Sequence, residues 1–189
     1  IAAGEVIERP ESIIKELVEN SIDAKSNKID IYIKEGGLSS IIIKDDGIGI
    51  NKNEIDIAFK SHTTSKINSI KDLDSIYTLG FRGEALPSIG ATARLRVQSS
   101  LKDSDDSWEI FVDNGIIEKV KPSATNVGTI VEVRDLFFAT PARLKFLKSD
   151  RIESQSILDI FKRMALVNPE IDFSLTDLSN PAKSKLIAD

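Results

Sequence analysis

The chain has 189 residues, 41% of them hydrophobic, and a net formal charge of −5. This is enough for one domain with a real core, while the acidic balance argues against a dedicated nucleic-acid-binding module. The absence of cysteine excludes disulfide bonds and thiolate zinc sites, and the single histidine excludes a histidine-rich metal site.

The N-terminal part of the chain is predicted to form one amphipathic helix and a β-hairpin. Pro10 suits the first turn of a helix, and apolar residues recur at helical spacing from Ile13 to Ile22. The alternating stretches "IDIYIK" and "SSIIIKDDG" predict two strands. Gly36-Gly37 lies between these stretches and indicates a hairpin connection.

The rest of the chain is predicted to form short helices and a strand meander. "NEIDIAFKS" indicates a short helix, "HTTSKINSIKD" a loop, and "GFRGEALPSIG" a helix that begins at Gly83. Four strands are expected at "ARLRVQSS", "SWEIFVD", "GIIEKV" and "GTIVEVRDL", with a turn at residues 113–115. A helix after Pro141, a helix over 151–166 and a last strand at "IDFSLTDL" complete an α+β sandwich with a mixed or largely antiparallel sheet.

One edge of the first helix carries three polar side chains. On a helical wheel, Glu16, Asn20 and Asp23 lie within roughly 60° beside the apolar stripe. A glutamate can accept a proton from a positioned water, and the carbonyl oxygen of an asparagine suits a hard cation such as Mg²⁺. The same spacing also fits an ordinary polar helix edge.

The second predicted strand ends in a carboxylate on its apolar face. Asp45 shares that face with Ile41 and Ile43, because side chains alternate along a strand. A carboxylate there requires hydrogen-bond donors, and the exocyclic amine of a purine is one candidate. Gly47 and Gly49 would let a flat ring approach the backbone. The alternative is that Asp-Asp-Gly only starts a turn.

Two further segments allow a functional and a plain interpretation. "GFRGEAL" places two glycines before a helix, where backbone N–H groups bind phosphate, although a turn also explains them. The chain has neither the P-loop pattern nor the dinucleotide-binding glycine pattern. The basic run of Arg143, Lys145, Lys148 and Arg151 fits either a DNA contact or, more simply, a solvated helix face.

Taken together, "ELVENSIDA", "DDGIGI" and "GFRGEAL" resemble the motifs of the GHKL ATPase superfamily, which includes gyrase B, the heat-shock chaperone ATPases, the sensor histidine kinases and MutL. Within it, "IAAGEVIERP", "SHTTSKI", "LGFRGEALPSI" and "DLFFATPARLKFL" resemble the MutL family of DNA mismatch repair proteins. The resemblance extends to about residue 166. It implies a two-layer α/β sandwich, with a mixed, mostly antiparallel sheet, helices on one face, and ATP held between the helices and a lid.

The resemblance also implies a slow Mg²⁺-dependent ATPase with ATP and Mg²⁺ as cofactors. It assigns Glu16 as the general base, Asn20 as the Mg²⁺ ligand and Asp45 as the partner of the adenine amine. Asp23 would support these residues without contacting the ligand. Thr129 would lie beneath the adenine, 64–66 would belong to the lid and 80–83 to the phosphate loop. The full set of implied nucleotide-binding residues is Asn20, Ala24, Asp45, Gly47, Gly49, Ile50, Thr64, Ser65, Lys66, Gly80, Phe81, Arg82, Gly83, Glu84, Leu86 and Thr129.

The implied function is an ATP-driven conformational and dimerisation switch. The implied partners are a MutS-like mismatch sensor, a second MutL-type protomer in a homodimer or heterodimer, and DNA, bound weakly and mainly outside this chain. The expected location is the cytoplasm in a bacterium or the nucleus in a eukaryote, with no membrane. Residues 1–189 would form a single ATPase domain of a longer chain that lacks an N-terminal arm and a following subdomain, so we expect weak hydrolysis and poor dimerisation from it alone.

Departures from the family pattern and two alternatives remain. Asp46 and Ala139 stand where the family commonly has asparagine, and Asp46 would add a negative charge near the site.

One alternative function is that of another enzyme of the superfamily, such as a topoisomerase subunit or a histidine kinase domain, although a kinase needs a phosphate-accepting histidine helix. The other is a nucleotide-sensing or DNA-binding module without meaningful catalysis.

Overall fold

The structure is a computed structural model that describes residues 7–61, 85–104, 106–179 and 185–188. Its helices are α1 (Pro10–Asp23), α2 (Lys52–Ser61), α3 (Ala85–Gly90), α4 (Pro141–Leu144) and α5 (Asp150–Val167), with a short 3₁₀ helix, η1 (Glu35–Gly37). Its strands are β1 (Lys28–Lys34), β2 (Ser40–Asp45), β3 (Arg94–Ser100), β4 (Ser107–Asp113), β5 (Ile116–Ile117), β6 (Lys121–Pro122), β7 (Gly128–Arg134), β8 (Asp172–Asp177) and β9 (Lys185–Ala188).

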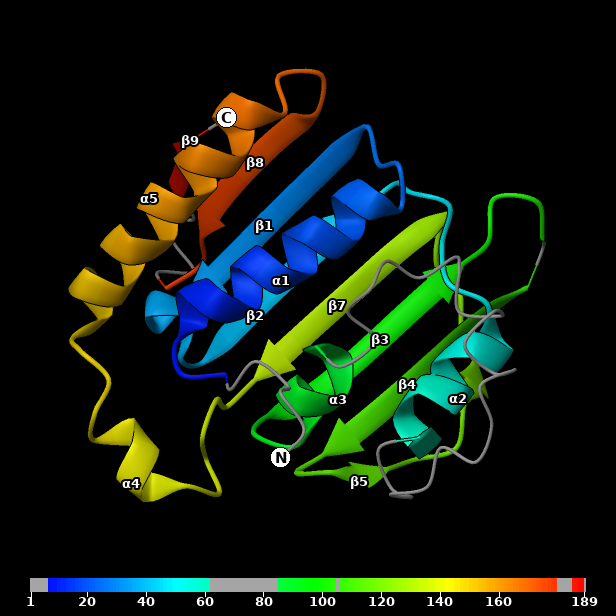
Figure 1. Cartoon of the computed structure of the whole chain (residues 1–189), viewed down its shortest axis with the longest axis horizontal. Coiled ribbons are helices and arrows are strands. Elements are labelled where there is room, and N and C mark those ends of the chain that lie inside the picture. The colour runs from blue at the N-terminus through cyan, green and yellow to red at the C-terminus, as the bar shows by residue number, and fades with distance from the viewer. Residues whose placement is uncertain (1–6, 62–84, 105, 180–184, 189) are drawn as a thin grey trace, which may run out of the picture.

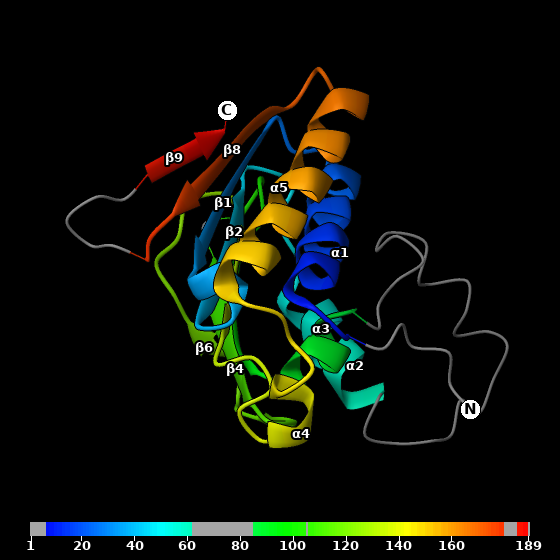
Figure 2. The same ribbon diagram turned by 90° about the vertical axis from the view of Figure 1, so that its left-hand side faces the viewer.

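The strands form one mixed sheet in the order β5-β4-β3-β7-β2-β1-β8-β9, with β6 paired to β4. Among the described pairs only β1 and β8 are parallel. The helices α1, α3 and α5 lie on one face of the sheet (Figure 1, Figure 2). This confirms the expected two-layer α+β sandwich. No helix in the described part of the chain is long and apolar enough to cross a membrane.

Most predicted elements are present, and three expectations are wrong in detail. The stretch "GIIEKV" forms the two-residue β5, after which β6 pairs separately with β4. The helix after Pro141 is a single turn with no buried residue, so no tertiary packing extends it. "IDFSLTDL" is not the last strand, because β9 pairs with it. The predicted turn is confirmed by left-handed backbone at Asn114 and Gly115.

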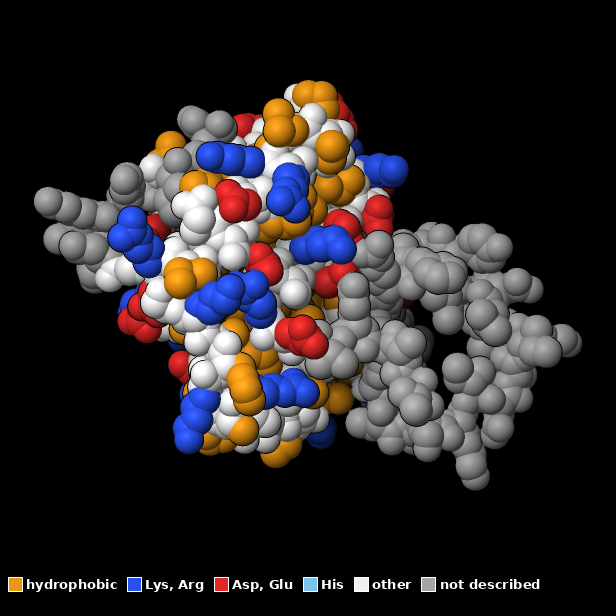
Figure 3. All heavy atoms as spheres, turned by 60° about the vertical axis from the view of Figure 1, so that its left-hand side comes forward, with side chains coloured by type: hydrophobic (Ala, Val, Ile, Leu, Met, Phe, Trp, Pro, Cys, Tyr) orange, Lys and Arg blue, Asp and Glu red, His pale blue; other side chains and the backbone are white. Residues whose placement is uncertain are grey.

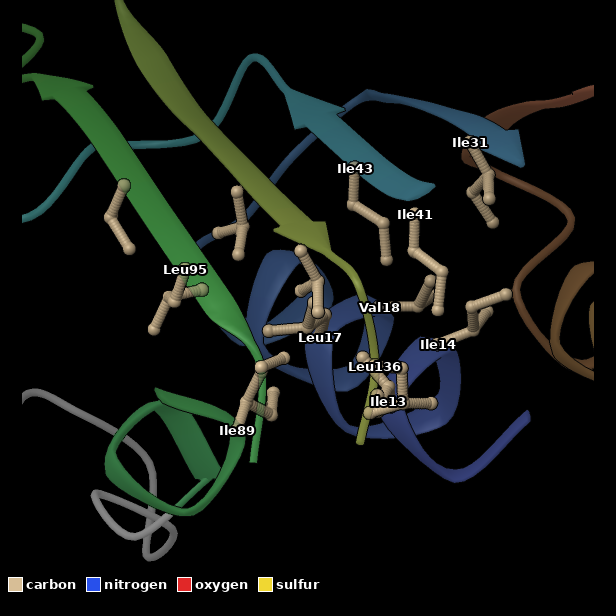
Figure 4. Packing of buried hydrophobic residues seen from close by; sticks show 14 of the residues in the cluster. Ile13, Ile14, Leu17, Val18, Ile31, Ile41, Ile43, Ile89, Leu95 and Leu136 are labelled. Atoms are coloured by element: carbon tan, nitrogen blue, oxygen red, sulfur yellow. The ribbon is translucent and has the colours of Figure 1, made fainter. Parts of the chain in front are cut away.

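The core lies between the sheet and the helices and fixes the rotation of α1. The apolar stripe of α1 packs toward inward-facing strand residues; the residues shown together in Figure 4 include Ile13, Ile14, Leu17, Val18, Ile31, Ile41, Ile43 and Leu95. Burial of one such side chain contributes about 1.5–3 kcal/mol. Because this stripe points at the sheet, the polar edge beside it is held in a defined direction.

The start of α1 is also anchored by a buried ion pair with α5. The Glu153 carboxylate is 0% exposed; it accepts a hydrogen bond from Arg9 at 3.2 Å and one from the backbone N–H of Lys148 at 3.0 Å. Gly36 packs against the same place, since a Cβ there would lie 2.8 Å from the Asp150 carbonyl oxygen. The N-terminal ends of α1 and α5 and the connection between β1 and β2 are therefore held together.

Replacing Arg9 with alanine is expected to lower the free energy of unfolding by about 3 kcal/mol, because it leaves the carboxylate of Glu153 buried without its cation. Urea denaturation monitored by circular dichroism measures the loss. Lys162→Ala removes an exposed cation from α5 and should change stability by no more than about 0.5 kcal/mol. Equal stability of the Arg9 variant and the control would show that the ion pair does not anchor α1.

Candidate nucleotide-binding site

The site is built around the carboxylate that ends β2. Asp45 is 8% exposed and lies on the buried face of its strand, as predicted. The Ser21 hydroxyl donates to its Oδ2 at 2.9 Å, and the Gly47 N–H donates to its Oδ1 at 3.0 Å. Burial raises the pKa of Asp45 above its ordinary value, and hydrogen bonding to Gly47, Ser21, Ser26 and the Thr129 backbone opposes that rise without cancelling it. A further donor on a ligand would be bound strongly here.

Asp45 begins a row of buried side chains that crosses four strands. It lies directly opposite Thr129 of β7, which lies opposite Ser99 of β3, which lies opposite Trp108 of β4. All four side chains are buried. The Ser99 and Thr129 hydroxyl oxygens are 3.0 Å apart. The strand pattern indicated Asp45 and the family resemblance indicated Thr129. Ser21, Ser99 and Trp108 were missed, because no local spacing signals a contact between separate elements.

The two glycines after Asp45 are required by packing within the protein itself. A Cβ on Gly47 would lie 2.7 Å from the Ala24 carbonyl oxygen, and a Cβ on Gly49, whose φ is +78°, would collide with the Ser100 carbonyl oxygen. The space beside each glycine is therefore filled by the protein itself. The loop over 46–51 needs these glycines to pack against the end of α1 and the end of β3. Their expected role of leaving room for a ring is not needed to explain them.

Two other predicted binding residues lie near this loop. Both backbone groups of Ile50 are engaged: its N–H donates to the Ser99 hydroxyl and its carbonyl oxygen accepts from the Trp108 indole N–H, each at 2.9 Å. Ala24 caps α1, and its carbonyl oxygen accepts from the Ile48 N–H at 2.9 Å. The predicted loop residues therefore form one bonded unit with α1, β3 and β4.

The polar edge of α1 faces this region only in part. Glu16 is 5% exposed and Asn20 is half-buried, but Asp23 is exposed. Ser21 of the same helix contacts Asp45, and Glu16 lies about 7.5 Å from Ser21 along the helix axis. Glu16 and Asn20 thus lie on the helix that contacts Asp45, whereas Asp23 lies on the solvent side.

Several predicted binding residues lie outside the described part of the chain, and α3 begins directly after them. Leu86 of α3 is half-buried against the core. The predicted residues without a described position are Thr64, Ser65, Lys66, Gly80, Phe81, Arg82, Gly83 and Glu84. Among the described residues, no group of three or more His, Cys, Asp or Glu side chains gathers as a metal site would require.

The departure at Asp46 has a structural explanation. Its side chain is exposed, and its Oδ1 accepts the backbone N–H groups of Asn27 at 2.8 Å and Lys28 at 2.9 Å. The carboxylate is therefore engaged at the start of β1. An asparagine oxygen could accept the same two hydrogen bonds, so either residue serves this contact.

All four residues of the basic run near α4 are exposed: Arg143, Lys145, Lys148 and Arg151. On the face that carries α4 and α5, Lys and Arg side chains are interspersed with Asp and Glu (Figure 3). A phosphate-binding surface would be expected to show one gathered basic patch. The mixed distribution favours the solvated-surface interpretation of this run.

Comparison with known proteins agrees with this geometry. The family of histidine kinase-, DNA gyrase B- and HSP90-like ATPases matches residues 7–134. The DNA mismatch repair protein MutL of Bartonella bacilliformis is 55% identical over 176 residues, which is 93% of this chain and 28% of that protein. MutL of Rickettsia typhi is 53% identical over 175 residues, 93% of this chain and 29% of that protein.

Solved structures show the same fold. The Aquifex aeolicus MutL ATPase domain complexed with ADP is 34% identical with a TM-score of 0.72, over 91% of this chain and 61% of that one. The N-terminal domain of a DNA repair protein is 32% identical with a TM-score of 0.79, over 97% of this chain and 53% of that one. The chain belongs to the histidine kinase-, gyrase B- and HSP90-like ATPase family and, within it, to the MutL proteins. It spans less than a third of the length of these curated relatives.

Asp45→Asn should separate ligand binding from folding. The amide oxygen can still accept from Gly47, and Ser21 can turn its proton to the Leu17 carbonyl oxygen, 3.1 Å away, and accept from the amide. We expect unchanged or higher stability at pH 7, because the neutral amide removes the cost of a buried charge. Binding of a fluorescent ATP analogue should weaken at least about tenfold, since the amide can present a donor to the adenine amine.

The pH dependence gives a second measurement of the same variant. Because the pKa of Asp45 is raised, the folded chain holds this proton more tightly than the unfolded chain, and wild-type stability falls as the pH rises through the folded-state pKa. The stability difference between variant and wild type should therefore shrink toward acidic pH. Asp46→Asn is the matched control and should alter neither property. Full ATP affinity in Asp45→Asn would remove this residue from the site.

Proposed function

We propose that this chain is the ATP-binding and ATP-hydrolysing domain of a MutL-type DNA mismatch repair protein. The observation that carries the proposal is the buried Asp45 carboxylate, which α1 holds through Ser21 while the same helix carries Glu16 and Asn20. Family membership and the ADP complex of the Aquifex domain support a nucleotide as the ligand. Residues 1–189 would act as one domain.

The adenine is proposed to bind at the end of the sheet. Asp45 accepts a hydrogen bond from the exocyclic amine, and Thr129 lies opposite it on the next strand. Burial in this position strengthens the hydrogen bond, because water competes poorly for the same acceptor. The loop that carries Gly47, Gly49 and Ile50, together with Ala24 and Leu86, would border the ring.

The triphosphate is proposed to extend along the polar edge of α1. Glu16 would accept a proton from the attacking water, and Asn20 would offer its side-chain oxygen to Mg²⁺. An amide oxygen as the protein ligand fits Mg²⁺, which keeps several waters and binds substrate phosphates. When bound, Mg²⁺ supplies neutralisation of the phosphate charge. Residues 64–66 and 80–84 are proposed as lid and phosphate loop.

The wider role follows from the relatives. Proteins named for DNA mismatch repair match this chain at more than 50% identity. We propose that ATP binding orders the lid and favours pairing of two MutL-type protomers, and that hydrolysis resets them. A MutS-like sensor and DNA are the proposed partners, the DNA mainly through other parts of the protein. The bacterial relatives support action in the bacterial cytoplasm.

Glu16→Gln should strongly slow hydrolysis while it preserves binding. Loss of a general base typically costs 10²–10⁴-fold in rate, and a residue that acts in chemistry need not change affinity. We expect single-turnover phosphate release to slow by at least about 100-fold, with ATP affinity within about threefold of wild type. Single-turnover conditions suit the slow hydrolysis that we expect from this chain.

Glu11→Gln provides the matched control, because Glu11 lies on the same helix and pairs with Arg9 at 3.1 Å, away from Ser21. It should hydrolyse ATP at the wild-type rate. Unchanged hydrolysis in Glu16→Gln would refute the assignment of the base. If the wild-type protein binds ATP but never hydrolyses it, the chain is a nucleotide sensor.

A further inference from the structure

The row that begins at Asp45 is the only polar one among three successive rows across the same four strands. The row before it consists of Ile43, Val131, Val97 and Ile110, and the one before that of Ile41, Val133, Leu95 and Val112. In the row of Asp45, the two middle strands carry the hydroxyl residues Thr129 and Ser99, which lie between Asp45 and Trp108. A packed core does not need hydroxyls there, so their hydrogen bonds show what the row does.

Ser99 has a complete set of hydrogen bonds in the centre of this row. Its hydroxyl donates to the Gly128 carbonyl oxygen at 3.0 Å and accepts from the Ile50 N–H at 2.9 Å. A serine hydroxyl has one proton, and Ser99 uses it on Gly128. The 3.0 Å contact with Thr129 must therefore be donated by Thr129. This leaves Thr129 able to act toward any other group only as an acceptor.

The consequence is an acceptor-only end of the site. The ionised Asp45 carboxylate accepts only, and Thr129 is opposite it on the neighbouring strand. Adenine presents an amino group at the position where guanine presents a carbonyl oxygen. An amine meets the Asp45 carboxylate favourably there, whereas a carbonyl oxygen would face that carboxylate, and Thr129 beside it would have no proton to offer.

The same serine also holds the neighbouring loop. Ile50 is held at its N–H by Ser99 and at its carbonyl oxygen by Trp108. The two anchoring residues are directly opposite each other on β3 and β4. The loop over 46–51 is thus fastened to the sheet at a fixed distance from Asp45.

We propose that Ser99 is a positioning residue that sets the purine specificity of the nucleotide site. It orients the Thr129 hydroxyl as an acceptor and, with Trp108, fixes the loop at Ile50, so that the site accepts adenine and rejects guanine. The inference rests on the proposed nucleotide-binding function and adds Ser99 and Trp108 to the residues that serve it.

Ser99→Ala tests the proposal through the ratio of ATP to GTP affinity. Without Ser99, the Thr129 hydroxyl is free to donate to a guanine carbonyl oxygen. We expect affinity for a non-hydrolysable ATP analogue to fall about five- to tenfold, as for loss of one buried hydrogen bond, while affinity for the GTP analogue stays the same or rises. Displacement of a fluorescent nucleotide from the protein measures both affinities.

Ser100→Ala makes the same substitution one residue further along β3, where the side chain makes no hydrogen bond to the described residues, and should leave the ratio of ATP to GTP affinity unchanged. A general loss of stability would weaken the binding of both nucleotides equally. A decrease in the ratio of ATP to GTP affinity is therefore the result that supports orientation of the Thr129 hydroxyl by Ser99. An unchanged ratio in a folded Ser99→Ala protein overturns the proposal.

If Ser99→Ala does not fold, Trp108→Phe tests the loop anchor, because it keeps an aromatic ring and removes the N–H that reaches Ile50. ATP affinity should fall about fivefold, with the hydrolysis rate at saturating ATP unchanged, and wild-type affinity would overturn the proposal. If the wild-type protein binds neither nucleotide, the proposed function fails and this inference fails with it. If the wild-type protein prefers ATP and the variants keep that preference, the inference alone fails.

Discussion

A buried carboxylate at the end of β2 is the constraint on which the site depends. Asp45 is buried, continues the apolar face of β2, and receives hydrogen bonds that include those from Ser21 and Gly47. The carboxylate lies in a place that disfavours its charge, and its hydrogen bonds within the protein offset this cost only in part. The raised pKa expresses that cost. A group that adds a donor recovers part of the cost, which makes the position a strong recognition point for a ligand amine.

The fold supplies this position through the packing of α1. The apolar stripe of the helix points at the sheet, and the ion pair between Arg9 and Glu153 fixes its N-terminal end. When the apolar stripe and the N-terminal end of α1 are both fixed, Ser21 contacts Asp45. The positions of Glu16 and Asn20 on the adjoining edge of the helix are then fixed as well. Residues far from the proposed nucleotide site thus determine where Glu16, the proposed catalytic carboxylate, lies.

The parts of the site that depend on local pattern were predictable from the sequence. Alternation along β2 places Asp45 on the apolar face, and helical spacing places Glu16 and Asn20 beside the stripe of α1. Ser99 and Trp108 were not predictable in this way, because β7 enters the sheet between β2 and β3 although it follows both in the chain. The packing requirement for Gly49 was also not predicted, because the group that excludes a side chain there is the backbone carbonyl of Ser100. The strand β9 has only four residues and shows too little alternation to detect.

The two ends of the proposed site differ in how they are built. The adenine end consists of one row of residues across β2, β7, β3 and β4, which the strand pairing keeps rigid. The proposed phosphate end comprises the polar edge of α1 and residues that lie outside the described part of the chain. A rigid base-binding end can hold the nucleotide with the same contacts while the phosphate end changes with the state of the γ-phosphate. Since Ser21 and Glu16 belong to one helix, α1 connects the two ends, and this division suits a domain in which binding persists while hydrolysis changes the conformation.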